Sequence, residues 1–378
     1  MPVVKADAYG HGAIHVARRL AKEGATIFAV AVAEEGLELR RAGILQSILV
    51  MGWIGKDQLA SLVEGGLTAN IHSVEMAEEL KIFLEGEEGR GGTSAFPPRL
   101  PIHLKLDTGM TRLGILPAEL PRVLDLIDGM KNRIFLEGVF QNFASADDPG
   151  DAQTEAQAIT FEECVRVVHA RGHRPSMIHT DNSAATMFRL KNPDPLSKKS
   201  SLGSPLHEAT HVRPGLALFA RVPGLSSETN DSLRDVMSFV SVVDQVKTVP
   251  AGTRVGYGGT FVCSRTTTLA IVPAGYADGV PRSLSGHGVV LISGRRCPIA
   301  GRVSMDATAV DGTDLPSAPA RGDEAVFFGT QSGTCLGVDE VAAAAGTVAW
   351  EILCGVGPRV PRIILSGGKI VARESKFL

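Results

Sequence analysis

The first 222 residues alternate short apolar segments with longer amphipathic ones. The apolar segments are rich in branched residues and apolar on both faces, as the strands of a buried parallel sheet are. They are Val3–Ala6, Ile27–Val32, Ile48–Gly52, Leu67–Ile71, Ile102–Leu106, Phe135–Phe140, Met177–His179 and Val212–Leu218. Between them, apolar residues recur at helical spacing, as in Ala13–Glu23 and Glu155–Arg171. Eight strands, each followed by a helix or a long connection, predict an α/β fold of the (β/α)8 TIM-barrel type.

The pattern changes after residue 222, where residues 223–234 are polar and linker-like. Beyond them, short alternating segments are separated by glycine and proline turns, which is typical of strands. These segments are Val236–Val249, Thr266–Val272, Val289–Ile292, Arg296–Ile299, Glu324–Phe328 and Arg362–Leu365. We therefore expect a barrel domain at 1–222 and a mainly β domain at 235–378. The polar inserts Gly86–Pro98 and Asn192–Ala209 are expected to form mobile surface loops.

Composition excludes several classes of function. The net charge is −3, so neither a nucleic-acid nor a membrane-surface partner is indicated. No apolar run has the length of a membrane span, and the N-terminus lacks the pattern of a signal peptide. The five cysteines are scattered without a Cys-x-x-Cys pair, which disfavours a disulfide framework or a zinc ribbon. Reduced thiols fit a cytoplasmic protein, and no metal is expected.

Polar residues follow the carboxyl ends of the expected strands, where barrel enzymes place their chemistry. A lysine at the end of a buried strand favours the neutral amine, which is a nucleophile for an aldehyde. Lys5 occupies such a position, although an ammonium that emerges into solvent at the barrel rim is the simpler alternative. Ser183 and Gly215 belong to the adjacent strands seven and eight, a corner where barrels often bind phosphate. Together with Arg213, these residues indicate a site for an aldehyde that carries a phosphate.

The chain has three tyrosines, and each stands beside a glycine. They are Tyr9, Tyr257 and Tyr276. Tyrosines that fill a core more often lie within apolar runs, whereas these lie where the backbone turns and a hydroxyl reaches a ligand. Tyrosines in surface loops are the alternative interpretation.

Seven blocks of sequence resemble the alanine racemase family, and together they extend over nearly the whole chain. They are Val3–Gly12, Lys105–Gly114, Asn182–Ala185, Val212–Gly215, Val255–Gly258, Gly275–Gly279 and Gly301–Asp306. The first block is similar to that family's cofactor-lysine signature, which is long and specific. The resemblance implies a barrel followed by a β domain, in the order given above.

The resemblance also implies an activity, the interconversion of L-alanine and D-alanine, which supplies D-alanine for the cell-wall polymer peptidoglycan. Lys5 would carry pyridoxal 5'-phosphate as an aldimine and move the α-proton on one face of the substrate. Tyr257, contributed by the partner subunit of a homodimer, would do so on the other face. Two bases are needed because a single base that returns its own proton mostly regenerates the starting enantiomer.

Further residues take roles from the same resemblance. Arg213 would meet the pyridine nitrogen, which an arginine does not readily protonate, and so would limit side reactions. Lys105 matches a lysine that is often carbamylated and that orients an arginine. The cofactor-binding set is Lys5, Tyr9, Asn182, Ser183, Arg213, Gly215 and Leu216. The substrate carboxylate is assigned to Arg112 and the backbone N–H of Met305, with Lys105, Asn142, Tyr276 and Asp306 in support.

Three departures from the family pattern carry expectations. Asn142 stands where the family usually has a histidine, and because asparagine does not titrate we expect weakened catalysis. Pro358 stands where some members have a tyrosine that narrows the entrance, so we expect the site to admit larger amino acids such as serine. The chain begins almost at the lysine block, whereas the family has a leading strand and helix. Either the start is misassigned or the segment is absent, and its loss would weaken folding and dimerisation.

The segment His207–His211 satisfies the His-Glu-x-x-His pattern of zinc proteases. That pattern requires both histidines on one helix, and the expected strand at Val212 leaves no room for one. We therefore expect a chance match, with a zinc hydrolase as a distant alternative. A related decarboxylase would lack the Tyr257 block, and a cofactor-binding barrel without activity would lack the β domain. An inactive homologue and a racemase of broader specificity remain alternatives.

Overall fold

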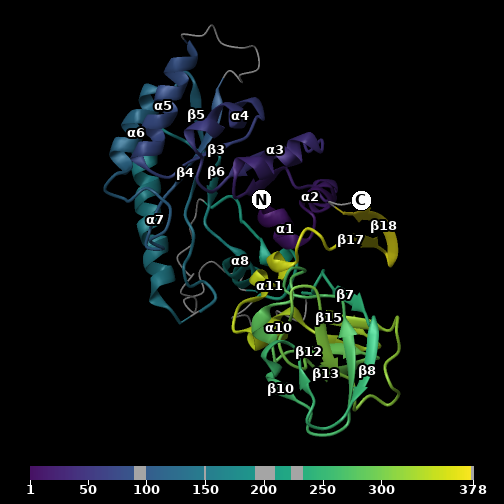
Figure 1. Ribbon diagram of the computed structural model, residues 1–378. Coiled ribbons are helices and arrows are strands. Elements are labelled where there is room, and N and C mark those ends of the chain that lie inside the picture. The colour runs from purple at the N-terminus through teal and green to yellow at the C-terminus, as the bar shows by residue number, and fades with distance from the viewer. Residues whose placement is uncertain (89–98, 149, 192–208, 223–232, 376–378) are drawn as a thin grey trace. The chain divides into compact units, whose positions relative to one another are not determined.

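The computed structural model describes residues 1–88, 99–148, 150–191, 209–222 and 233–375 (Figure 1). Most of the expected linker at 223–234, and most of both polar inserts, lie outside these residues. The described chain forms two compact units. The first contains Met1–Ala8, Ala13–Leu218 and Val222, and the second contains Tyr9–Gly12, Phe219–Arg221 and Leu233–Leu378.

Six short parallel strands form most of the barrel in the first unit. They are β1 (Ile27–Val30), β2 (Ser47–Val50), β3 (Ala69–Ile71), β4 (Leu100–Lys105), β5 (Ile134–Phe140) and β6 (Met177–His179). β1 pairs with β2, and β3 to β6 pair in chain order. A parallel bridge between Leu49 and Thr68 joins the two groups. All four residues of β1 are buried, as expected of a strand that is covered on both faces.

Two extended segments close this ring. Val3 forms a parallel bridge with Ala29 of β1, and His211 forms one with His179 of β6. The N–H of Val3 donates to the carbonyl of Pro214 at 2.9 Å, which joins the first segment to the last. The six strands and these two segments together make the predicted (β/α)8 barrel.

Helices follow the strands of the barrel, as predicted. They are α2 (Ala13–Lys22), α3 (Ala33–Arg41), α4 (Leu59–Glu64), α5 (Val74–Glu88), α6 (Leu120–Gly129), α7 (Ala152–Ala170) and α8 (Ser183–Lys191), with short η1 (Lys56–Gln58) and η2 (Leu216–Leu218). In α6, Leu120, Val123, Leu124 and Ile127 are buried at spacings of three and four residues, which places them on one face. Figure 1 shows α5, α6 and α7 alongside β4 and β5.

Two of the expected strands are wrong in their extent. Val3–Ala6 pairs only at Val3, and the chain then enters the helical turn α1 (Lys5–Gly10). Val212–Leu218 is not a strand, because the pairing is at His211 and Leu216 begins η2. Both segments turn where the resemblance places cofactor-binding residues. The helical turns at these places therefore end the extended chain before the apolar segment ends.

The turn α1 is left-handed. Ala6, Asp7, Ala8 and Tyr9 have φ values between 51° and 55°, a region that costs roughly 1–2 kcal/mol per non-glycine residue. The N–H of Ala8 nevertheless donates to the carbonyl of Val4 at 2.9 Å, as in a regular helical turn.

Two carboxylates fix this left-handed turn. A Glu35 oxygen accepts the N–H of Ala6 at 2.6 Å, and Asp7 accepts the N–H of Ala13 at 2.7 Å. The backbone is therefore held in a costly conformation by hydrogen bonds that join the turn to Glu35 and Ala13, which is a mark of functional segments.

The second unit is mainly β, as predicted. Its strands are β7 (Phe239–Val242), β8 (Gln245–Val249), β9 (Arg254–Val255), β10 (Phe261–Val262), β11 (Thr267–Val272), β12 (Val289–Ile292), β13 (Arg295–Pro298), β14 (Thr308–Asp311), β15 (Glu324–Gln331), β16 (Thr334–Leu336), β17 (Arg362–Ser366) and β18 (Lys369–Glu374). Its helical elements are η3 (Tyr257–Gly259), η4 (Arg282–Leu284), α10 (Val338–Ala345) and α11 (Ala349–Gly355).

Antiparallel pairing organises these strands. One sheet has the order β14-β11-β8, and another has the order β13-β12-β15-β16 with β7 also paired to β15. Val236–Val249, expected as one strand, is therefore two strands in different sheets. Val255, Cys263, Leu269 and Ala300 form a core cluster beside the first sheet. Among the described residues, no helix combines the length and apolar character needed to cross a bilayer.

Replacing Ala6 by glycine tests the left-handed turn. Ala6 is exposed, so Ala6→Gly removes the steric penalty of its Cβ without opening a cavity. We expect the free energy of unfolding to rise by up to about 1 kcal/mol in chemical denaturation.

The matched control is Ala156→Gly at an exposed position within α7, which should lower the free energy of unfolding by about 1 kcal/mol. Equal destabilisation by both substitutions would show that Ala6 is not strained.

Candidate active site

Arg213 is the most deeply buried cation among the predicted site residues, at 5% exposure. Its Nη1 donates to the carbonyl oxygen and to Nδ1 of His179, both at 2.8 Å. Its Nη2 donates to the carbonyls of Gln141 at 2.6 Å and Thr180 at 3.0 Å, and to Oδ1 of Asn142 at 3.5 Å. Among the described residues no acceptor engages Nε, so this N–H remains available for a ligand.

Burial lowers the pKa of Arg213 to about 10, and the Asp181 carboxylate opposes that shift. The guanidinium thus remains a cation at neutral pH, and carbonyl oxygens take the place of its hydration. The aromatic ring of Phe140 lies 5.3 Å from the guanidinium carbon, so the orientation of Arg213 is fixed on several sides.

The predicted phosphate corner is built from two adjacent turns. Ser183 begins α8, and Leu216 begins η2. Oγ of Ser183 accepts the backbone N–H of Gly215 at 2.9 Å and that of Ala217 at 3.2 Å. One hydroxyl and two backbone N–H groups therefore lie close together, which suits an anion.

Asn182 has a structural task at this corner. Its Oδ1 accepts the N–H of Ala185 at 3.1 Å, and its Nδ2 donates to the carbonyl of Phe143 at 3.3 Å. The side chain thereby holds the start of α8, and its predicted contact with the cofactor stays a prediction.

Three cations surround Lys105, which is 7% exposed at the end of β4. Burial, followed by the charges of Arg112, Arg213 and Lys5, lowers the pKa of Lys105 to about 8. Its Nζ lies 5.8 Å from the centroid of the Phe140 ring. A substantial fraction of this amine is neutral near pH 8, and a negative charge on it would offset the neighbouring cations.

Asp107 shapes the loop that presents Arg112. Its Oδ1 accepts the N–H groups of Gly109 and Thr111 at 3.0 Å, and its Oδ2 accepts that of Arg112 at 3.1 Å. Thr111 has a φ of 54° in this tight loop. The side chain of Arg112 is exposed, which leaves it accessible to a substrate carboxylate.

Asn142 lies beside Arg213, and its contact with the guanidinium is long. Besides the 3.5 Å contact with Arg213, its Nδ2 donates to the carbonyl of Phe143 at 2.9 Å and approaches the sulfur of Met110 at 3.2 Å. The position that departs from the family pattern is therefore directly attached to the arginine network.

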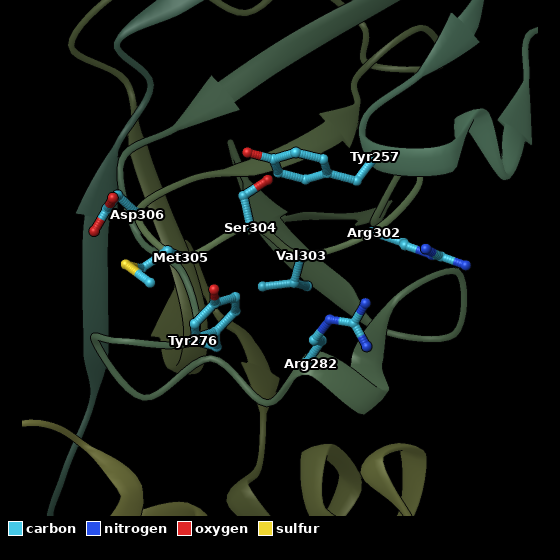
Figure 2. Close-up of a pocket in the computed structure, with 8 residues that line it drawn as sticks. All are labelled: Tyr257, Tyr276, Arg282, Arg302, Val303, Ser304, Met305 and Asp306. Atoms are coloured by element: carbon cyan, nitrogen blue, oxygen red, sulfur yellow. The ribbon is translucent and has the colours of Figure 1, made fainter.

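The second unit gathers four predicted residues around one pocket. The pocket has a volume of about 350 Å³. It is lined by Tyr257, Tyr276, Arg282, Arg302, Val303, Ser304, Met305 and Asp306 (Figure 2). Tyr257 is 71% exposed, and both neighbouring glycines have positive φ values, 69° at Gly256 and 70° at Gly258. Sequence reasoning missed Arg282, Arg302 and Ser304, although two of them lie in the quoted block Gly301–Asp306.

Arg359 fixes the loops of this pocket, and sequence reasoning missed it as well. Its Nε donates to Asp278 at 2.7 Å, and its Nη2 donates to Asp306 at 2.6 Å. The N–H of Tyr276 donates to the carbonyl of Ser304 at 3.0 Å. Arg359 follows Pro358, so the position singled out at the entrance adjoins the residue that joins both loops.

Tyr9 belongs to the second unit, although it lies in the same left-handed turn as Lys5. Its ring centroid lies 5.4 Å from that of Phe219. Burial raises the pKa of Tyr9 to about 12, so its hydroxyl stays protonated and can donate to an acceptor. Lys5 itself follows the buried residues Val3 and Val4 and is half-buried.

The zinc-protease pattern fails at its described end. Thr210 and His211 lie in extended chain, with the N–H of Thr210 donating to the carbonyl of Ile178 at 2.8 Å. His207 and Glu208 lie outside the described residues. Where the structure describes the chain, no group of three or more His, Cys, Asp or Glu residues could hold a metal ion.

Two family models match the chain and between them extend over most of it. The alanine racemase N-terminal domain matches residues 1–223, and the alanine racemase C-terminal domain matches residues 236–364. The chain belongs to the alanine racemase family. The resemblance drawn from the seven sequence blocks is thus confirmed.

Individual relatives agree with this assignment. The alanine racemase of Carboxydothermus hydrogenoformans is 38% identical over 368 residues, which is 96% of this chain and 92% of the relative. The structure of alanine racemase from Bacillus anthracis with bound L-Ala-P has a TM-score of 0.84 at 31% identity, covering 100% of this chain and 90% of that one. Alanine racemase from Bartonella henselae with covalently bound pyridoxal phosphate has a TM-score of 0.77 at 27% identity, covering 94% and 89%.

Lys105 should carry a carbamate in the purified protein. A neutral amine attacks carbon dioxide and releases a proton, and the resulting anion is favoured by the three neighbouring cations. With ¹³C-labelled bicarbonate near pH 8, NMR should detect a protein-bound carbamate carbon.

This carbamate signal should disappear in Lys105→Ala and persist in Lys22→Ala, which alters an exposed lysine at the end of α2. An unmodified Lys105 at saturating bicarbonate would contradict the prediction.

Proposed function

We propose that the protein interconverts L-alanine and D-alanine with pyridoxal 5'-phosphate as cofactor, and so supplies D-alanine for the cell wall. Family membership over nearly the whole chain carries this proposal. The chain has Lys5, Arg213 and Tyr257 within the blocks that resemble the family, which argues against an inactive homologue.

Several residues of the chain fit this cofactor. Arg213 keeps Nε–H available for the pyridine nitrogen while its other nitrogens are held by the protein. Ser183, Gly215 and Leu216 would hold the phosphate, with further contacts from Tyr9 and Asn182, and Lys5 would bond the aldehyde carbon. The bound cofactor withdraws electrons from the α-carbon and so makes its proton removable.

The chain's own residues then transfer the α-proton and orient the substrate. We assign proton transfer on one face of the substrate to Nζ of Lys5, and on the other face to the hydroxyl of Tyr257. Arg112 and the backbone N–H of Met305 would hold the substrate carboxylate, with Tyr276 and Asp306 in support. Lys105 would orient Arg112. Arg213 would itself be the positively charged partner of the pyridine nitrogen, to which it does not readily give a proton.

We further propose a cytoplasmic homodimer whose active sites each take Lys5 from one subunit and Tyr257 from the other. In support of this, the two residues lie in different compact units of the chain. The high exposure of Tyr257 also suits a side chain that completes a site elsewhere.

Mixing two inactive variants tests the composite sites. Lys5→Ala and Tyr257→Phe should each abolish conversion of D-alanine to L-alanine, because each site loses one of its two bases. Co-expression in equal amounts should restore about a quarter of wild-type activity, since half of the random dimers contain one intact site out of two.

The control is co-expression of Lys5→Ala with wild-type protein, which separates restoration from simple dilution. A mixture that stays inactive would contradict sharing of sites between subunits. Absence of conversion by the unmodified protein, loaded with cofactor, would reject the proposed function itself.

Asn142→His should raise turnover. A histidine at this position adds a titratable ring next to Arg213, where Asn142 now makes only a 3.5 Å contact. We expect kcat to increase by about 10-fold with KM changed much less. Asn142→Gln keeps an uncharged amide and serves as the control, and an equal response to both substitutions would overturn the explanation.

A further inference from the structure

A chain of hydrogen bonds runs through the barrel behind Arg213. Nη1 of Arg213 contacts Nδ1 of His179 at 2.8 Å, and Nε2 of His179 contacts Nδ1 of His103 at 2.9 Å. Nε2 of His103 contacts a carboxylate oxygen of Glu137 at 3.2 Å. Both histidines have no exposed surface, whereas the Glu137 side chain is 15% exposed.

Chemistry fixes the direction of every bond in this chain. A guanidinium only donates, so Nδ1 of His179 must accept and its hydrogen must sit on Nε2. That hydrogen is donated to Nδ1 of His103, whose own hydrogen therefore also sits on Nε2. Glu137 as a carboxylate accepts it. Burial lowers the pKa of both histidines, consistent with two neutral rings.

The backbone of β5 is irregular at the point that delivers Glu137. Ile102 of β4 pairs with Leu136, and His103 pairs with Gly138, so Glu137 is an extra residue in β5. Such a bulge re-aims a side chain and is frequent near active sites.

Gly138 makes room for the ring that Glu137 contacts. A Cβ at Gly138 would lie 2.4 Å from Nδ1 of His103, closer than any tolerated contact. The bulge and the missing side chain at Gly138 thus both serve the contact between His103 and Glu137.

We propose that Glu137 is a positioning residue for Arg213, acting through His103 and His179 by fixing the hydrogen of each ring on Nε2. The ring of His179 then always presents a lone pair to Arg213. This holds the guanidinium in the orientation that leaves Nε for the cofactor. The effect on catalysis rests on the proposed function. The Phe140 ring, stacked on His179 at 4.8 Å between centroids, keeps the imidazole plane in place.

Histidine tautomers measured by ¹⁵N NMR in the full-length, cofactor-loaded protein test the chain directly. We expect His103 and His179 each to show a protonated Nε2 and a bare Nδ1, with assignments from His103→Gln and His179→Gln. A hydrogen on Nδ1 of either ring, or a doubly protonated ring at neutral pH, would overturn the proposal without any variant of Glu137.

Glu137 variants test the functional consequence. Glu137→Leu removes the terminal acceptor, so we expect a mixture of tautomers at His103 and a loss of about 10-fold in kcat with KM changed much less. Glu137→Gln retains an acceptor oxygen and should restore the single tautomer and most of the turnover. Glu163→Leu, at an exposed position of α7, should behave as wild type.

The outcomes separate this inference from the proposed function. Predicted tautomers in a protein that does not racemise alanine would support the hydrogen-bond chain and reject the function. A racemase whose turnover is unchanged by Glu137→Leu would overturn the positioning role and leave the function intact.

Discussion

Burial of one cation organises the end of the barrel that holds the candidate site. Arg213 is taken out of water, and the free energy lost with its hydration must be replaced by oxygen and nitrogen acceptors. These come from Gln141, which follows β5, from His179 at the end of β6, and from Thr180 directly after it. One guanidinium therefore joins the ends of β5 and β6 by hydrogen bonds. Because these acceptors replace the hydration of Arg213, they also fix the position of its side chain.

Much of this arrangement could be predicted from sequence because it depends on periodicity. Segments apolar on both faces gave the order of the barrel strands, and the alternating pattern after residue 222 gave the β unit. Polar residues that follow the strands predicted which side chains would lie near one another, and the charge of Arg213 does lower the pKa of Lys105. The pattern is informative because a short strand that is buried on both faces consists almost entirely of apolar residues.

Other features depend on backbone geometry that cannot be recognised from the residue types. Ala6 to Tyr9 contain no glycine, yet all have positive φ, because hydrogen bonds accepted by Glu35 and Asp7 hold them. The bulge at Glu137 shifts register by one residue, which an alternating pattern conceals. Arg359 was missed because an ion pair between residues distant in sequence has no local signature.

Strain in the left-handed turn has a consequence for local stability. Backbone strain at Ala6–Tyr9 lowers the free energy needed to open this segment relative to the rest of the barrel. A ligand that binds only the closed turn opposes opening in proportion to its free concentration. Amide exchange and protease cleavage at this segment would then slow as the cofactor accumulates. Loss of the cofactor would then leave this turn more open to cleavage.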